Sequence, residues 1–300
     1  MGQSALVPVC CLAVALGWAQ PTQAAKAEDG VYVYNLFREA SNCQELFGRL
    51  RRLTLRPTVI LSIEEGPEFI LDRPDGEQQL ACVLGFLRGS ERRVKAMFLQ
   101  DPIFLDRGQE AVRRAERLGE FIAEHPEDLA GVQINVEPHS DQRWPEADAT
   151  GRSRLLQGLL ELLGQVRPHL EGFPLSVVVP WWYSHIAPDV REASPKSLFE
   201  AADEVYMMAY GDEDPRTDEN FAGSLRARLG SAFAFSEIGP THVILSKHEF
   251  SSRRRLEDEL KRLRRALASS PGFAGTAVFH ATSDFQAATA QPPPGRVRNR

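Results

Sequence analysis

Residues 131–139 read Gly-Val-Gln-Ile-Asn-Val-Glu-Pro-His, and this stretch decides the fold that the sequence predicts. Successive side chains of a strand point to opposite faces, so the aliphatic residues would share one face and the polar residues the other. The polar residues are Gln133, Asn135, Glu137 and His139. A buried polar row is costly unless it is hydrogen-bonded or lines a binding cavity. The pattern predicts a strand leading into a binding site, or, as the alternative, an exposed strand end that the proline terminates.

Apolar runs alternate with amphipathic helical stretches on both sides of this segment. The expected strands are residues 31–37, 58–63, 94–99, 131–137, 175–179, 204–209, 243–245 and 275–279, and the expected helices are residues 43–53, 78–87, 107–125, 150–170, 197–201, 219–235 and 254–267. Eight strands separated by helical stretches, without an internal repeat, predict an α/β protein with one (β/α)8 TIM barrel, a fold of about 250 residues. An open doubly wound sheet is disfavoured, because no glycine-rich nucleotide-binding turn follows the first strand. For the same reason we expect no cofactor.

The two ends of the chain differ in composition from the expected barrel. Residues 6–19 form an apolar run too short to cross a bilayer, and small residues follow it up to Ala25. This pattern predicts a cleaved signal peptide over residues 1–25 and a secreted or periplasmic protein. Because no Lys or Arg precedes the run, an uncleaved membrane anchor is the alternative. The barrel domain is expected over residues 26–290, and the proline-rich residues 291–300 are expected to be disordered.

Charge and cysteine content narrow the possible partners. The formal net charge is -6 and the basic runs of residues 253–265 alternate with acids at helical spacing, so the chain has no general basic field and nucleic acid is not an expected partner. Cys43 and Cys82 lie in expected helices that follow consecutive strands. In an exported protein they would form a disulfide or remain two separate buried thiols.

A metal site is a separate possibility that the sequence disfavours. His139, His248 and His280 could converge on Glu137, yet no paired histidine motif of a metal site occurs in the sequence. We therefore expect no metal.

The residues at the carboxyl ends of the expected strands define the candidate site, because TIM barrels carry their chemistry there. They are Asn35, Glu64, Asn135, Glu137, His139, Trp181, Trp182, Tyr183, Tyr210, Asp212, Glu249 and His280. Acids and amides hydrogen-bond sugar hydroxyls, and aromatic rings stack on the apolar face of a pyranose. A carbohydrate is therefore the expected ligand, with Glu137 and Glu249 as the candidate catalytic residues and the other residues of this set binding the sugar.

Three segments resemble the chitinase-like glycoside hydrolases of family eighteen. Residues 131–137 resemble the fourth-strand motif DGxDxDxE, residues 207–210 (Met-Met-Ala-Tyr) its sixth strand, and residues 275–280 its last strand, with His280 in place of the usual tryptophan. The resemblance implies a TIM barrel that acts on a polysaccharide or oligosaccharide with Glu137 as general acid. Asn135 takes the place of the aspartate that orients the substrate's acetamido group in that family.

Two alternatives stay open. The barrel glycosidases that use two glutamates carry an acid after the fourth strand and a nucleophile after the seventh, and Glu137 and Glu249 are similar to that arrangement. An inactive barrel that binds a glycan or a partner protein is the other alternative, because the acids around Glu137 are replaced by Asn135 and Gln133 and a fold alone does not establish catalysis.

Overall fold

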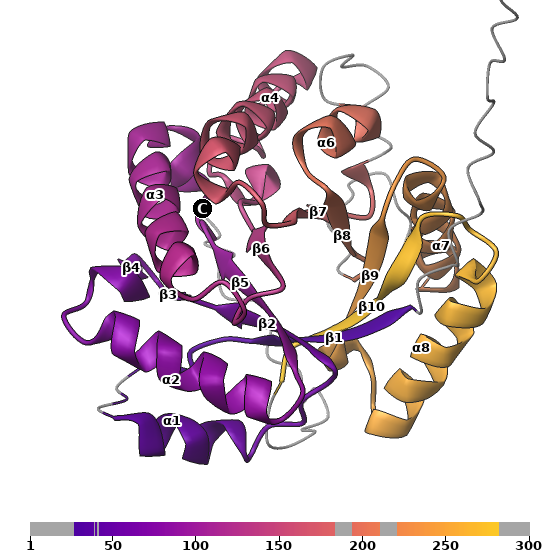
Figure 1. Ribbon diagram of the computed structural model, residues 1–300. Coiled ribbons are helices and arrows are strands. Elements are labelled where there is room, and N and C mark those ends of the chain that lie inside the picture. The colour runs from indigo at the N-terminus through magenta and orange to yellow at the C-terminus, as the bar shows by residue number, and fades with distance from the viewer. Residues whose placement is uncertain (1–26, 39, 41, 184–193, 211–220, 282–300) are drawn as a thin grey trace, which may run out of the picture.

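The computed structural model describes residues 27–38, 40, 42–183, 194–210 and 221–281, and within it eight parallel strands close into a barrel (Figure 1). Around the barrel the order is β1-β10-β9-β8-β7-β6-β5-β2. The strands are β1 (Glu28–Val33), β2 (Thr58–Ser62), β5 (Arg93–Phe98), β6 (Gly131–Ile134), β7 (Leu175–Pro180), β8 (Glu204–Met208), β9 (Thr241–Ser246) and β10 (Phe273–Phe279). The (β/α)8 TIM barrel that the sequence predicts is confirmed. The predicted signal peptide and the predicted disordered tail lie outside the described residues.

Helices surround the strands on the outside of the barrel (Figure 1). They are α1 (Cys43–Leu50), α2 (Gly76–Gly89), α3 (Gly108–Glu124), α4 (Ala149–Val166), α6 (Pro195–Ala201), α7 (Phe221–Ser236) and α8 (Arg253–Leu267), with short 3-10 turns η1 (Ile70–Asp72), η2 (Pro102–Leu105), η3 (Pro138–Ser140), η4 (Arg167–Leu170) and η7 (Lys247–Glu249). Side-chain caps fix several helix starts: Asn42, Asp148 and Ser252 each accept a backbone N–H of the first turn. The segment after β2 contains a small antiparallel hairpin, β3 (Glu64–Glu65) with β4 (Glu68–Phe69).

Strict alternation divides the strand side chains between two cores. Val132, Ile134 and Val136 point outward and are buried with helix residues in the large core between barrel and helices. The smaller core inside the barrel consists of Tyr32, Ile60, Met97, Val178, Tyr206, Met208, Ile244 and Ala277. Gln133, which pairs with Met97 across β5 and β6 and is fully buried, belongs to the inward series. The polar face of the fourth strand therefore points into the barrel, as the alternation predicts.

A charged cluster fills the barrel near the amino ends of three strands. The ammonium group of the buried Lys95 pairs with Glu204 and lies 5.1 Å from the centre of the Tyr206 ring, and His242 Nε2 lies 3.4 Å from Glu204 Oε2. Burial alone would raise the pKa of Glu204, but the hydrogen bond from His242 and the charge of Lys95 lower it to about 2. Each charge thus has a partner, which a buried charge requires.

A disulfide joins α1 and α2. Cys43 and Cys82 are bonded, with their Cα atoms 5.9 Å apart. The rings of Phe47 and Phe86 stack beside them with centroids 4.9 Å apart. Of the two possibilities that the sequence left for these cysteines, the structure therefore has the bridge. No helix among the described residues is long and apolar enough to cross a membrane.

We expect the double variant Cys43→Ser/Cys82→Ser to be less stable than the oxidised protein. The bridge closes a loop with a sequence separation of 39 and so restricts the unfolded chain, which is worth about 3 to 4 kcal/mol in the free energy of unfolding. Urea unfolding of both proteins measures the difference, and the reduced wild type should match the double variant. Equal midpoints for the oxidised wild type and the double variant would contradict the expectation.

Candidate active site

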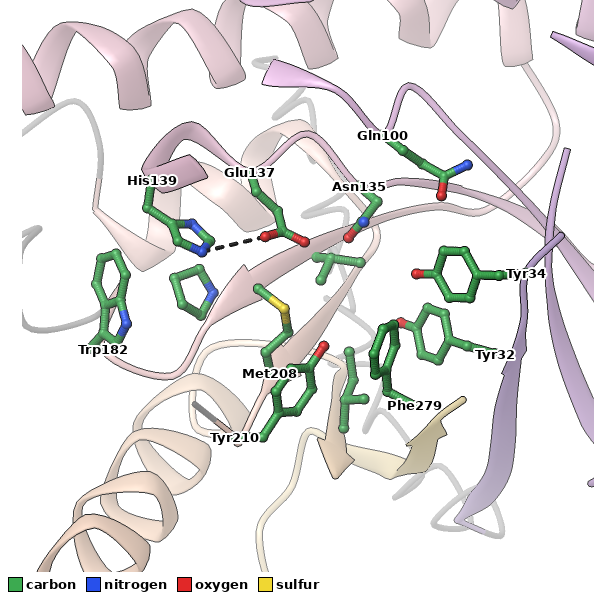
Figure 2. A pocket seen from close by; sticks show the side chains of 13 residues that line it. Tyr32, Tyr34, Gln100, Asn135, Glu137, His139, Trp182, Met208, Tyr210 and Phe279 are labelled. Carbon is green, nitrogen blue, oxygen red and sulfur yellow. Dashed lines mark ion pairs between the residues drawn. The ribbon is translucent and has the colours of Figure 1, made fainter. Parts of the chain in front are cut away.

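A cavity of about 410 Å³ lies at the carboxyl end of the barrel, where the polar face of β6 meets the ends of its neighbours (Figure 2). It is lined by Tyr32, Tyr34, Gln100, Asn135, Glu137, His139, Val178, Pro180, Trp182, Met208, Tyr210, Ile244 and Phe279. Among these described residues Glu137 is the only carboxylate, and none is a lysine or an arginine. The cavity therefore combines one acid with amides, hydroxyls and aromatic rings.

Glu137 reaches the cavity because the chain stays extended beyond β6. Gln133, Asn135 and Glu137 follow one another on the inward side, and Pro138 then starts the turn η3. The turn brings His139 back toward the carboxyl group, with His139 Nε2 3.4 Å from Glu137 Oε2 (Figure 2). The Glu137 side chain is about a quarter exposed, at 25%, so a ligand can reach it.

His139 is a neutral partner for Glu137. Burial lowers the pKa of His139 to about 4, so its imidazole is uncharged near neutral pH. The Trp182 ring lies edge-on to it, with centroids 5.2 Å apart, and Trp144 packs behind Trp182 at 5.8 Å. A neutral imidazole can donate or accept a hydrogen bond through Nε2, and it adds no positive charge beside the Glu137 carboxyl group.

Aromatic side chains form the opposite wall. The Phe279 ring lies between Tyr34 and Tyr210, at centroid distances of 5.4 Å and 5.5 Å, and Tyr32 stacks on Tyr34 at 6.2 Å. Burial raises the pKa of Tyr34, and the charge of Glu137 adds to the rise. Burial also raises the pKa of Tyr32 well above its ordinary value. Both hydroxyls stay protonated near neutral pH, and that of Tyr34 donates to Met97 Sδ at 3.7 Å.

Five of the residues that the sequence singles out line this cavity together: Asn135, Glu137, His139, Trp182 and Tyr210. The two neighbours of Trp182 do not line it. Trp181 and Tyr183 are buried in the outer core, where Tyr183 packs near Phe235.

Four further candidates occupy other places, and a fifth cannot be located. Asn35 is exposed, and its own backbone has a φ of 53°. Glu64 is buried behind the cavity in an ion pair with Arg114, 2.6 Å apart. Glu249 pairs with Arg228 at 3.0 Å and does not line the cavity. His280 lies beside it, with its ring 6.2 Å from Tyr34 and 5.3 Å from His248. Asp212 lies outside the described residues.

The sequence points to Gln100 only as a residue that ends the third expected strand, and the sequence reasoning missed Tyr32, Tyr34 and Phe279. Strict alternation identifies the three aromatic residues, because the inward series of β1 runs through Tyr32 to Tyr34 and that of β10 ends at Phe279. Alternation does not identify Gln100. Alternation along β5 would turn Leu99 inward, but Leu99 adopts φ 52° and is buried in the outer core, so Gln100 faces the cavity instead.

Within the described part of the chain, no group of three or more His, Cys, Asp or Glu side chains could hold a metal ion.

Comparisons with known proteins support the fold. No protein-family model and no curated protein matches the sequence. Among solved structures, an exo-beta-1,4-mannosidase from Opitutaceae bacterium strain TAV5 is similar with a TM-score of 0.57 and 12% identity over 84% of this chain and 51% of the mannosidase. A GH18 chitinase from Pseudoalteromonas aurantia gives a TM-score of 0.51 and 11% identity over 86% of this chain and 95% of the chitinase.

The chain thus has a remote structural resemblance to these two glycosidases in its TIM-barrel fold. The chain spans about half the length of the mannosidase. At these identities the likeness concerns the barrel alone.

We expect His139 to make stability depend on pH. In the folded protein it binds a proton only near pH 4, whereas an unfolded histidine does so below about pH 6.5, so its contribution is complete above pH 6.5 and is lost as the pH falls toward 4. Relative to His139→Gln, the wild type should lose roughly 2 kcal/mol of unfolding free energy between pH 7 and pH 5. Urea unfolding of both proteins at the two pH values checks this, and a difference that does not change with pH would contradict it.

Proposed function

We propose that the protein is a glycoside hydrolase that binds a glycan in the cavity and uses Glu137 as its general acid. One observation carries the proposal: an accessible carboxyl group stands in an aromatic-walled cavity at the carboxyl end of a TIM barrel. A general acid delivers its proton to the leaving oxygen of the glycosidic bond, and the opposite wall of Tyr34, Tyr210 and Phe279 offers ring faces to the sugar. The structural similarity to glycosidases supports the same class.

The position of Glu249 bears on the mechanism. A retaining enzyme with two carboxyl groups needs them about 5.5 Å apart across the sugar. The described cavity lining offers only Glu137, whereas Glu249 is held by Arg228, which also donates to the carbonyl oxygen of Ala209. This arrangement favours a mechanism in which the nucleophile belongs to the substrate.

An N-acetylated sugar supplies such a nucleophile. As Glu137 protonates the leaving oxygen, the bond between that oxygen and the anomeric carbon breaks, and the acetamido oxygen bonds to the same carbon. Water then attacks that carbon, the bond between the carbon and the acetamido oxygen breaks, and a proton of the water passes to the Glu137 carboxylate, which restores the acid. Asn135 lies next to Glu137 on the inward face and can hydrogen-bond the acetamido group. We therefore propose a glycan with N-acetylated units as the substrate.

A barrel that binds a glycan without cleaving it is the second candidate. Asn135 favours it, because a neutral amide stabilises the positive charge of an oxazolinium intermediate less than an aspartate does.

The variant Glu137→Gln decides between the two. It keeps the shape of the side chain but cannot deliver a proton, so turnover of N-acetylchito-oligosaccharides should fall about a hundredfold or more while affinity stays nearly unchanged. Glu249→Gln is the matched control and should retain activity, provided that its melting temperature shows a folded protein. Full activity in Glu137→Gln would refute the hydrolase proposal. Binding by the wild type without turnover of any glycan would establish the binding barrel.

We also propose that the protein acts outside the cytoplasm. The apolar run of residues 6–19 and the disulfide between Cys43 and Cys82 support this, because disulfides persist in oxidising compartments. Mass spectrometry of exported protein should give an N-terminus near Lys26. Mature protein that keeps Met1 would speak for the membrane anchor instead.

A further inference from the structure

Gln100 lines the cavity with an amide whose orientation is fixed from behind. Gln100 Nε2 donates to Ser62 Oγ at 2.7 Å, and Ser62 Oγ donates in turn to the carbonyl oxygen of Glu64 at 2.7 Å. Because the single hydroxyl proton of Ser62 is used on Glu64, its oxygen can only accept from Gln100. The NH2 group must therefore face Ser62, which leaves the carbonyl oxygen for the cavity. Figure 2 shows this oxygen on the side of Tyr34.

The backbone of Gln100 is held by a buried ion pair. Its N–H donates to Glu64 Oε2 at 3.0 Å, and the other oxygen of Glu64 accepts from Arg114 at 2.6 Å. Glu64 and Arg114 are only 5% and 7% exposed. Burial raises the pKa of Glu64, and the hydrogen bond and charge of Arg114 oppose the rise. The carboxyl group of Glu64 thus ties the end of β5 to α3.

Arg114 has little freedom to move. Besides Glu64 it donates to Glu110 at 2.9 Å and to the carbonyl oxygen of Pro67 at 2.8 Å. Its guanidinium carbon lies 4.9 Å from the centre of the Phe104 ring. A guanidinium engaged on three sides is a rigid support for the carboxyl group that it binds.

We propose that Gln100 determines specificity in the glycan cavity: its carbonyl oxygen accepts a hydrogen bond from a hydroxyl group of the bound sugar, and Ser62, Glu64 and Arg114 are the positioning residues that aim it. The proposal rests on the glycan-binding function proposed above. A sugar that lacks the matching hydroxyl leaves the Gln100 oxygen desolvated and unpaired, which is how a fixed polar group discriminates between ligands. An amide that could rotate would offer its NH2 group instead and lose the discrimination.

The experiment measures discrimination rather than affinity alone. Calorimetry compares N-acetylchitotetraose with analogues that each lack one hydroxyl, in a Glu137→Gln background so that turnover does not consume them. With Gln100 intact, one analogue should bind about tenfold or more weakly than the parent. Gln100→Leu keeps the size but removes the acceptor, so it should bind the parent and that analogue within about twofold of each other.

Two further variants separate positioning from general structure. Ser62→Ala keeps Gln100 but releases its amide, so discrimination should shrink while the melting temperature stays close to that of the background protein. Gln157 lies on α4 and lines another surface pocket. The variant Gln157→Leu makes the same chemical change as Gln100→Leu and should leave discrimination unchanged.

The outcomes distinguish the two proposals. If Gln100→Leu discriminates as well as its parent, the role of Gln100 is overturned while the glycan site stands. If Ser62→Ala discriminates fully, the positioning role of Ser62 is overturned. If neither wild type nor background protein binds any oligosaccharide tested, the proposed function fails and the inference fails with it.

Discussion

Closure of the parallel barrel is the constraint on which the rest of the structure depends. Once eight strands pair in a ring, every second side chain must enter an interior that holds few atoms, and the others must meet the helices. The outer core contains Val132, Ile134 and Val136, and the side chains of Gln133, Asn135 and Glu137 therefore point into the barrel. The active-site candidate is thus a consequence of how the strand is packed.

The polar groups at the two ends of the barrel interior differ in how they are paired and how accessible they are. Near the amino ends of the strands, Lys95, Glu204 and His242 neutralise one another in a closed cluster. At the carboxyl end, Glu137 lies 3.4 Å from the neutral His139 and remains partly accessible. A carboxyl group that a ligand can reach can exchange a proton with that ligand, which suits general-acid chemistry. Glu64 and Glu249 differ from Glu137, because each pairs with an arginine and neither lines the cavity.

The cavity wall also depends on one position, directly after β5, where side chains no longer alternate between the two faces of the strand. Leu99 takes a left-handed conformation directly after β5, and this turns Gln100 toward the cavity. Such a backbone is unfavourable for a residue with a Cβ atom and persists where its surroundings fix it. Here the buried Leu99 side chain and the hydrogen bond from Gln100 N–H to Glu64 provide that fixation. The cavity wall therefore depends on residues that never touch a ligand.

The sequence by itself determined the barrel, because helical and strand periods are local properties of the chain, and it determined that Asn135 and Glu137 face inward, because a two-residue period follows from the strand alone. Strict use of that period would also have found Tyr32, Tyr34 and Phe279. Only the tertiary structure decided that Gln100 enters the cavity, that Glu64 and Glu249 are held by arginines, and that Cys43 meets Cys82. These outcomes depend on contacts between residues far apart in the chain and on one left-handed backbone position, neither of which leaves a periodic signal in the sequence.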